Sequence, residues 1–438
     1  MLNILKIAVR NLTRFGRRTL LTSSLITLGI VGVLLFVAVA GSFKTIMIGQ
    51  FTDSMLGHLE VHRKGYVASI DSLPLNLNMQ PTMIGKVEQA LSKMDAVEAY
   101  APRVKFGAMF SNFTETTSIR MSGIDPEKEA ATTPLLPGRV IEGSKEGALL
   151  KPGEILIPAL IARGFKVKVG DTVVIVATNR DGSVNGKTFT VRAVLESVSG
   201  PGGKDGYITI DDARALLRMK EAEVSEIAIR LKNPAQLNAV YAQLSKELSS
   251  IAGAGASAGA SAGTGTGSGA MSGTAGKGGG SGLEVHTWAA LSPFSNIANM
   301  IDLLAVFIKI MMVSIVLISV MNVMMMAVYE RIREIGTISA IGTPPRRILG
   351  LFLTEGLLLG LGGAALGTAI SLAAIYALNV WKVTVKFGMQ QNIVLSPAVS
   401  ATDIMTIAAM VVIMALLASL QPAWKASRMD PVTALGHV

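Results

Sequence analysis

Four long apolar stretches divide this chain, one near its beginning and three close together near its end. A helix needs roughly 20 apolar residues to cross the hydrocarbon core of a bilayer, so each stretch is a candidate span. The segment between the first two stretches, about 41–300, is too polar to lie in lipid and predicts a large folded domain on one side of a membrane. The stretches are Thr19–Ala40, Leu303–Val328, Ile348–Leu378 and Ile404–Leu420.

The composition of the 438-residue chain is typical of a membrane protein, with 50% hydrophobic residues, 16% charged residues and a mean hydropathy of +0.50. Its net charge of +10 comes largely from loops beside the apolar stretches. It forms no basic stripe with interleaved aromatic residues, so nucleic acid is not an expected partner. The absence of cysteine excludes structural disulfides and thiolate chemistry, but it does not identify the compartment.

The basic residues predict the orientation of the spans, because loops rich in lysine and arginine stay in the cytoplasm. The N-terminus, the loop Tyr329–Arg347 and the tail Lys425–Val438 are basic. We therefore expect both termini and this loop to be cytoplasmic, and the large domain and the short loop Asn379–Asp403 to lie outside. The residues that carry this assignment include Lys6, Arg10, Arg14, Arg17, Arg18, Arg331, Arg333, Arg346 and Arg347.

The first apolar stretch has a second interpretation as a secretory signal peptide. Ala38-Val39-Ala40 before Gly41 resembles a small-residue cleavage site that follows a basic segment. The apolar run from Leu20 is, however, longer than the usual central region of about 7–15 residues, which favours an uncleaved span. N-terminal sequencing of the mature protein would distinguish the two.

Residues 1–18 predict a basic amphipathic helix that lies in the membrane interface. We expect the chain to turn from this helix into the bilayer near Gly16. The apolar residues that recur at helical spacing are Ile4, Leu5, Ala8, Val9, Leu12 and Phe15.

The large domain has a mixed α/β pattern. Helical spacing predicts helices at Met83–Met94, at Asp211–Met219 with an aspartate near its N-cap, and at Leu237–Leu248. The strand-rich centre, about 123–210, predicts an insertion into a β-α-β frame built from Leu59–Ile119 and Ser225–Trp288. The expected strands are His58–His62, Glu154–Pro158, Thr172–Ala177, Thr188–Val194, Gly206–Ile210, Glu226–Leu231 and Leu283–His286.

Residues 252–282 are almost entirely Gly, Ala, Ser and Thr. Such a segment cannot bury a core and is expected to be a flexible coil. It interrupts the frame just before the last strand, so we interpret it as an expanded loop within the domain and not as a domain boundary.

Motifs for chemistry are weak. Gly182–Thr188 resembles a phosphate loop, but three residues separate its glycines where the motif needs four, and its place between two strands favours a hairpin turn. His58 and His62, the pair nearest in sequence, lie too far apart on one face of a strand to share an ion. The sequence therefore predicts no active site, no metal site and no bound cofactor.

The third span carries two pairs of glycines, Gly356 with Gly360 and Gly363 with Gly367. In lipid, where helices associate through close contact, missing side chains let backbones approach. These glycines predict tight helix–helix contacts, either within the chain or with a second copy.

The cytoplasmic loop carries the most specific pattern. Charged residues after Tyr329 extend the second span as a helix into water, Gly336 permits a bend, and a short segment then runs to Gly342 and two prolines. Ile338 and Ile341 give this segment an apolar face with no core of its own, which predicts either a partner or an ordinary interfacial helix.

This loop resembles the "ERxREIG…xxAIG" signature of the MacB/LolC/LolE/FtsX-type ABC transporter permeases. The tail from Gln421 to Leu435 is similar to the family's "PAxxAxxxDPxxAL" ending, and Leu12–Leu21 is similar to the family's first helix. The order of one span, a large outer domain and three more spans also fits, so the resemblance covers the whole chain.

The resemblance implies an α+β outer domain with a β-α-β "porter" part and an inserted "sabre" part, in a membrane protein with four transmembrane helices. The expected organisation is an interfacial helix at 1–18, spans at 19–41, 301–328, 348–378 and 404–421, an outer domain at 42–300, a coupling loop at 329–347, an outer loop at 379–403 and a cytoplasmic tail at 422–438.

The resemblance also implies that the loop docks on a separate ABC ATPase, which uses ATP and magnesium, and that two permease chains pair as a homodimer or heterodimer. ATP hydrolysis would then move the outer domains by mechanotransmission, with the permease itself not an enzyme. The implied coupling residues are Glu330, Arg331, Arg333, Glu334, Gly336, Thr337, Ile338, Ala340, Ile341 and Gly342.

The substrate is the least determined part of the resemblance. Residues 57–62 followed by Gly65-Tyr66 favour release of lipoproteins toward a carrier from the bacterial inner membrane. One alternative is MacB-like efflux of a toxin, peptide or macrolide with an outer-membrane adaptor. Another is an FtsX-like regulator of periplasmic cell-wall hydrolases.

Overall fold

The computed structural model of the protein describes residues 2–14, 16–144, 148–197, 201–257, 282–292, 294–387 and 390–430. The chain forms two compact units. The helical unit comprises Met1–Ile46 and Ile297–Val438, and the sheet unit comprises Met47–Asn296. Most of the Gly/Ala/Ser-rich segment and the final residues of the tail lie outside the described residues.

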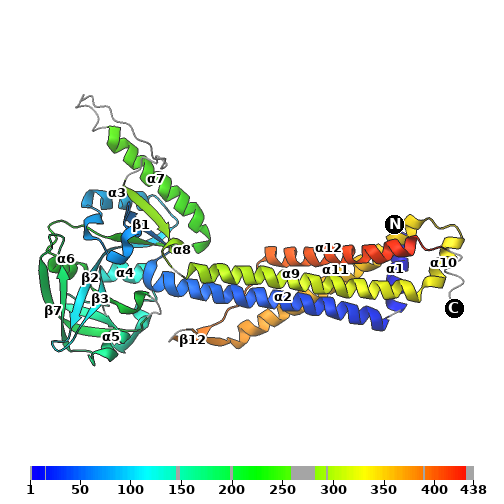
Figure 1. Ribbon diagram of the computed structural model, residues 1–438, viewed down its shortest axis with the longest axis horizontal. Coiled ribbons are helices and arrows are strands. Elements are labelled where there is room, and N and C mark those ends of the chain that lie inside the picture. Colours follow the sequence, from blue (N-terminus) through cyan, green and yellow to red (C-terminus); the bar gives the residue numbers. More distant parts are fainter. Residues whose placement is uncertain are drawn as a thin grey trace. The chain divides into compact units, whose positions relative to one another are not determined.

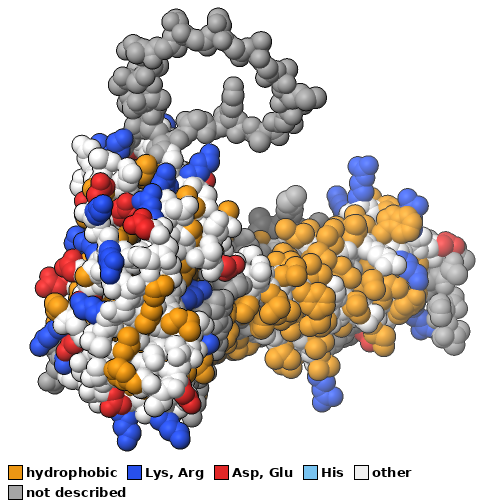
Figure 2. Space-filling model, turned by 60° about the vertical axis from the view of Figure 1, so that its left-hand side comes forward, with side chains coloured by type: hydrophobic (Ala, Val, Ile, Leu, Met, Phe, Trp, Pro, Cys, Tyr) orange, Lys and Arg blue, Asp and Glu red, His pale blue; other side chains and the backbone are white. Residues whose placement is uncertain are grey.

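The helical unit contains four helices that are long and apolar enough to cross a membrane (Figure 1). Many of their large apolar side chains are exposed, and Figure 2 shows hydrophobic side chains covering the visible face of this unit. A helix surface of this kind is stable in lipid, so the protein is a multi-pass membrane protein. The four helices are α2 (Gly16–Phe51), α9 (Ser295–Glu330), α11 (Pro345–Trp381) and α12 (Ala401–Ser427).

Shorter elements join these helices. Helix α1 (Leu2–Arg14) precedes α2, so the expected change of direction near Gly16 falls between the two helices. Helix α10 (Ile332–Ala340) lies between α9 and α11, and the hairpin of β11 (Thr384–Phe387) and β12 (Gln390–Val394) lies between α11 and α12.

The glycines of α11 bring it against two neighbours within the same chain. A Cβ atom built on Gly356 would lie 2.6 Å from Ser419 on α12, and one on Gly360 would lie 2.8 Å from Cβ of Ala415. These distances are shorter than real side chains tolerate, so only glycine permits this approach of α11 to α12.

The second pair of glycines faces a different helix. A Cβ atom on Gly363 would lie 2.5 Å from Ile26 on α2, and one on Gly367 would lie 2.8 Å from Ile30. Helix α11 therefore uses one pair of glycines for each neighbour, and both contacts lie within one chain.

The sheet unit is built on a single ten-stranded sheet with the order β10-β1-β9-β2-β3-β8-β5-β7-β4, to which β6 adds by pairing with β2 and β7 (Figure 1). Most pairs are antiparallel, but β8 runs parallel to β3 and β5 runs parallel to β7. The strands are β1 (Leu59–Arg63), β2 (Val97–Ser111), β3 (Thr116–Ile124), β4 (Val140–Gly143), β5 (Glu154–Pro158), β6 (Thr172–Thr178), β7 (Val184–Leu195), β8 (Asp205–Thr209), β9 (Glu226–Leu231) and β10 (Leu283–Thr287).

One face of the frame strands packs on α3 (Pro81–Ser92) and α7 (Leu237–Ser257). Leu59 and Val61 of β1 contribute to this apolar core, together with residues of both helices. Because side chains alternate across a strand, the residues between them point to the other face. The remaining helices are α4 (Pro126–Thr132), α5 (Ala159–Gly164), α6 (Ile210–Leu216) and α8 (Trp288–Leu291).

The start of α6 and the turn between β6 and β7 confirm two local expectations from the sequence. Helix α6 begins at Ile210, and its N-cap is Thr209, whose hydroxyl accepts a hydrogen bond from the amide of Asp212, so the expected aspartate near the N-cap is confirmed. The segment that resembles a phosphate loop forms the β6–β7 hairpin, with Gly182 at a φ of +80° in its turn. A left-handed turn residue suits glycine and explains the motif without a phosphate.

We predict that Gly363→Ala destabilises the helical unit by about 1–3 kcal/mol, because the new methyl group overlaps the branched Ile26 side chain. The matched control is Gly362→Ala, since nothing lies within 4 Å of a Cβ atom at that position. The control should be neutral, or stabilising by up to about 1 kcal/mol from its higher helix propensity. Thermal unfolding in detergent measures both, and equal melting temperatures for the two variants would contradict the close contact.

Candidate functional site at the α9–α10 elbow

The elbow between α9 and α10 lies at one residue. Helix α9 ends at Glu330 and α10 begins at Ile332, while Arg331 between them has non-helical angles of φ −112° and ψ 19°. The expected bend at Gly336 is therefore wrong, because Gly336 lies buried inside α10. The side chain of Arg331, at this break, is bonded to a partner on α11.

That partner is Glu355. The guanidinium Nη1 of Arg331 donates to Glu355 Oε1 at 3.1 Å, and Nδ2 of Asn11 on α1 donates to the same oxygen at 2.8 Å. Arg331 is 8% exposed and Glu355 is 3% exposed, so the charges are removed from solvent. A buried charge of this kind is stable only when it is paired and hydrogen-bonded. The cluster therefore ties α1, the elbow and α11 together.

Helix α10 has one buried and one exposed side. Ile335 and Gly336 are buried against the helical unit, whereas Ile338 is 41% exposed and Ile341 is 79% exposed. Gly342 ends the segment with a φ of +93°, and its amide donates to the carbonyl of Ser339 at 3.0 Å. Such a left-handed residue after a helix favours glycine. The elbow thus presents an apolar surface that the described residues of this unit leave exposed.

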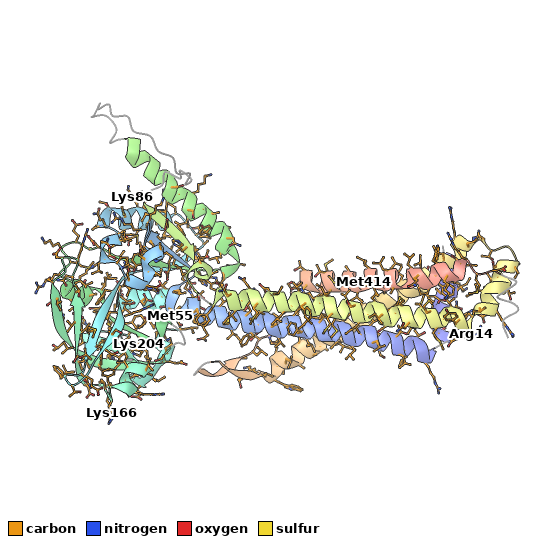
Figure 3. The ribbon with its side chains drawn as sticks, viewed as in Figure 1. Arg14, Met55, Lys86, Lys166, Lys204 and Met414 are labelled. Atoms are coloured by element: carbon orange, nitrogen blue, oxygen red, sulfur yellow. The ribbon has the colours of Figure 1, made fainter. Side chains whose placement is uncertain are left out.

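The other expected coupling residues surround this surface. Arg333, Glu334, Thr337 and Ala340 are exposed, and so is Glu330 at the end of α9. Arg14 of α1 lies 3.8 Å from Glu334, at the end of the helical unit where Figure 3 labels it. Exposed pairs of this kind contribute little to stability.

Sequence reasoning missed Asn11 and Glu355. A usable signal was present, because Glu355 is an ionisable residue inside a long apolar stretch and such residues are rarely without a role. Its partners were not predictable by spacing, since Asn11 is 344 positions away.

A second joint lies in the sheet unit, where the chain leaves α2. One turn of π-helix, Thr52–Leu56, follows α2 directly. Asp53 Oδ1 lies 2.7 Å from Arg230 Nη1 on β9, and Arg230 Nε lies 2.9 Å from Glu98 Oε2 on β2. The carbonyl of Asp53 also accepts from the amide of Leu135 at 2.9 Å. Asp53, in the turn that follows α2, is thus bonded directly to β9 and to Leu135, and through Arg230 it is linked to β2.

His58 completes this joint. Its Nδ1 accepts from the amide of Leu231 at 3.0 Å, and its carbonyl accepts from the amide of Trp288 at the start of α8. Burial lowers the pKa of His58, although nearby Asp53 opposes the shift, so the ring is neutral and can accept this hydrogen bond. The joint therefore includes both the segment after α2 and the segment that leads to α9.

We predict that Glu355→Leu destabilises the protein by about 3–5 kcal/mol, because it leaves the buried Arg331 charge without its carboxylate. The double variant Arg331→Met with Glu355→Leu should recover most of that stability, since an apolar pair replaces a buried ion pair. Thermal unfolding in detergent measures both. If the single and double variants lose the same stability, the ion pair does not hold the elbow.

Comparisons with known proteins find two matching families along the chain. The family model of the MacB-like periplasmic core domain matches residues 19–247, and that of the FtsX-like permease C-terminal matches residues 306–431. A solved structure, the periplasmic region of MacB from Actinobacillus actinomycetemcomitans, aligns with a TM-score of 0.34 at 12% identity, covering 56% of this chain and 92% of that one.

Two curated relatives match a shorter part of the chain. The pyoverdine export ATP-binding/permease protein PvdT of Pseudomonas syringae pv. tomato is 40% identical over 118 residues, which is 27% of this chain and 16% of that protein. The macrolide export ATP-binding/permease protein MacB of Syntrophobacter fumaroxidans is 33% identical over 123 residues, 27% of this chain and 15% of that protein. The match thus spans less than a fifth of either relative.

The first family match covers slightly more than half of the chain, and the second covers three of the four long helices. Both confirm the resemblance seen in the loop and tail motifs. The chain therefore belongs to the MacB/FtsX-type permeases of ABC transporters.

Proposed function

We propose that this permease passes movement from a partner ABC ATPase, which binds ATP and magnesium, to the sheet unit. The observation that carries the proposal is the exposed apolar side of α10, formed by Ile338 and Ile341 on a helix whose other side is anchored. Apolar side chains next to charged ones at a helix elbow are suited to a protein partner. The ATPase acts in trans, and the permease contributes no nucleotide chemistry.

The buried cluster of Arg331, Glu355 and Asn11 links the start of α10 to α1 and α11. A push on α10 reaches α9 and α11 together, because Arg331 lies at the end of α9 and pairs with Glu355 of α11. Helices α2 and α9 continue along the chain into the sheet unit, where the Asp53–Arg230 pair fixes the segment after α2. Movement is passed on without a substrate crossing the bilayer, and a second permease chain completes the transporter.

We propose export of a molecule from the outer side of the membrane as the transport reaction. The two relatives are named for pyoverdine export and macrolide export. Three residues of the segment that favoured lipoprotein release, His58, His62 and Tyr66, are buried and are not available for docking. Lipoprotein release remains the alternative, and stimulation of ATPase activity by a siderophore or macrolide, as opposed to a lipoprotein, distinguishes the two.

The proposed location is the bacterial inner membrane, with α10 and both termini in the cytoplasm and the sheet unit outside. The basic residues beside α1 and α10 support this orientation, since Arg14, Arg17, Arg346 and Arg347 flank the apolar helices.

We predict that Ile338→Asp weakens binding of the ATPase subunit by about tenfold or more, equivalent to about 1.4 kcal/mol, because it places a charge in the apolar contact. The ATPase subunit is first identified by co-purification from native membranes, and its binding and stimulated ATP hydrolysis are then titrated with purified permease.

The matched control is Ile338→Leu, which keeps the apolar surface and should retain coupling. Both variants are checked for membrane insertion and melting temperature. Normal binding and stimulation with Ile338→Asp would remove this surface from the mechanism.

We predict that single cysteines label from opposite sides of the membrane. The chain has no native cysteine, so Ala340→Cys on α10 and Thr114→Cys on the β2–β3 hairpin each provide one reactive thiol at an exposed position. A membrane-impermeant maleimide should label Thr114→Cys in spheroplasts and Ala340→Cys only in inverted vesicles. Labelling of Ala340→Cys in spheroplasts would reverse the proposed topology.

A further inference from the structure

A row of charged side chains crosses the sheet unit on the face opposite its apolar core. Glu284 on β10 lies opposite His62 on β1, His62 lies opposite Glu226 on β9, and Glu226 lies opposite Arg103 on β2. Residues directly opposite each other in neighbouring strands share a face of the sheet. The register of four strands therefore places acid, histidine, acid and arginine side by side.

A second row lies one step along the same face. Glu60 is two residues before His62 on β1 and lies opposite His286 on β10. Nε2 of His62 is 3.3 Å from Glu60 Oε2 and 3.5 Å from Glu226 Oε2, and one ligand atom from each of the three residues lies within 4.8 Å of the others. Two carboxylates and an imidazole thus converge on one point.

These side chains are fully buried and poorly satisfied. His62 and Glu226 are 0% exposed and Glu60 is 1% exposed. Both ring nitrogens of His62, Oε1 of Glu60 and Oε2 of Glu226 have no hydrogen-bond partner among the described residues, and neither has Nδ1 of His286. Buried polar atoms are almost always paired, so a group of nitrogen and oxygen atoms that lack hydrogen-bond partners and face one another indicates a bound ligand.

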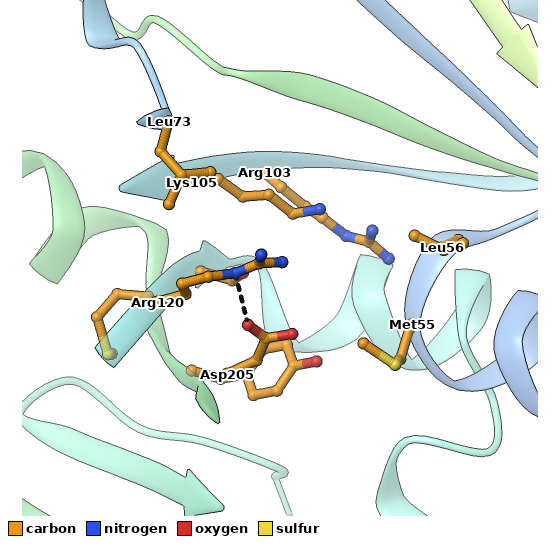
Figure 4. Close-up of a pocket in the computed structure, with 10 residues that line it drawn as sticks. Met55, Leu56, Leu73, Arg103, Lys105, Arg120 and Asp205 are labelled. Atoms are coloured by element: carbon orange, nitrogen blue, oxygen red, sulfur yellow. Dashed lines mark hydrogen bonds and ion pairs between the residues drawn. The ribbon is translucent and has the colours of Figure 1, made fainter. Parts of the chain in front are cut away.

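The second carboxylate oxygen of Glu226, Oε1, is paired with two cations. Lys105 Nζ lies 2.8 Å and Arg103 Nη1 lies 3.1 Å from Glu226 Oε1, which leaves Oε2 directed toward His62. Figure 4 shows Arg103 and Lys105 beside a cavity of about 50 Å³, across which Arg120 pairs with Asp205. Outer contacts of this kind orient the ligands of metal sites.

The charge balance leaves a deficit of positive charge. Four carboxylates surround the two rows, those of Glu60, Glu226, Glu284 and Glu129, the last of which binds Arg103 through two hydrogen bonds. The only cations paired with them in the described part of the sheet unit's charged rows are Arg103 and Lys105. With a neutral His62 the three buried carboxylates, those of Glu60, Glu226 and Glu129, exceed the two cations by one negative charge, which either a proton on His62 or a bound metal ion offsets.

We propose that Glu60, His62 and Glu226 bind a divalent transition-metal ion of the zinc class, with His286 as the fourth ligand. Imidazole nitrogen and carboxylate oxygen are ligands that zinc prefers. Tetrahedral ligands at about 2.0–2.2 Å from zinc lie about 3.3 Å from one another, which matches the two distances from His62 Nε2. The His286 ring lies edge-on to His62 with centroids 5.5 Å apart, close enough for a side-chain rotation to complete the site.

The site joins strands that lead to different membrane helices. Strand β1 follows α2 and its π-helical turn, and β10 leads through α8 to α9. A metal ion between β1, β9 and β10 reinforces the pairing of these strands, which is a structural role. Metal binding itself stands independently of the proposed transport function and is measured without an ATPase.

A proton is the competitor for His62. Burial by itself lowers the pKa of His62, but Glu226 and Glu60 raise it to about 9. A protonated imidazole pairs with the carboxylates and binds no metal, because a metal ligand must be unprotonated. A direct binding experiment at pH 8, with zinc or cobalt at micromolar concentration, distinguishes the two states. The metal binds if it displaces the proton from His62, and it does not bind if His62 stays protonated.

The test uses the full-length protein, purified in detergent, treated with a chelator and passed over a desalting column. We expect one equivalent of Zn²⁺ or Co²⁺ per chain to be retained, with visible cobalt absorption bands that Zn²⁺ abolishes. His62→Gln should weaken Co²⁺ binding by about 100-fold and remove the bands. His58→Gln is the matched control, since it lies four residues away, keeps a hydrogen-bond acceptor for Leu231, and should leave binding unchanged.

If His62→Gln does not fold, the unaltered protein still decides the matter through its cobalt spectrum and the rise in its melting temperature with Zn²⁺. A protein that retains less than a tenth of an equivalent of metal, or a His62→Gln variant that binds Co²⁺ with unchanged affinity and spectrum, overturns the proposal.

Discussion

The ion pair between Arg331 and Glu355 is the constraint on which the geometry of the elbow depends. A carboxylate inside an apolar helix must find a cation and hydrogen bonds, because water does not reach it. Arg331 supplies the cation from the one non-helical residue between α9 and α10. Asn11 adds the second hydrogen bond and brings α1 to the same point. The buried pair therefore lies at the bend and joins it to α1 and α11.

Helix α11, which carries Glu355, packs closely against two neighbouring helices. Gly356 and Gly360 bring α11 against α12, while Gly363 and Gly367 bring it against α2. Helix α11 also carries Glu355, so the helix that pairs with the elbow is packed closely against two other spans. In lipid no hydrophobic drive holds helices together, and such contacts supply the stiffness that a side-chain interface would lack. Movement is then shared among helices, as the proposed coupling requires.

Sequence reasoning identified the elements whose signal is local. The apolar spans, the strands β5 and β9 and the hairpin at Gly182 follow from residue patterns over short windows. It placed the elbow at Gly336 because glycine is the residue most permissive of a bend, but the partner of Arg331 lies on another helix and decides the position. The same limit applies to His62, which was compared with His58 along one strand, whereas its neighbours Glu226 and His286 come from other strands. Contacts that depend on strand order or helix packing are not encoded in local spacing.

The order of strands in the sheet unit joins the segment that follows α2 to the segment that precedes α9. The chain enters this unit after α2 and leaves toward α9, yet β1 and β10 are neighbours paired over five residues in a continuous register. Displacing one strand along the other by a single residue would move every side chain to the opposite face. Such a slip would carry His62 and Glu60 into the apolar core and Leu59 and Val61 out of it, which the cost of burying charged groups strongly opposes. The register itself therefore resists displacement of one strand against the other.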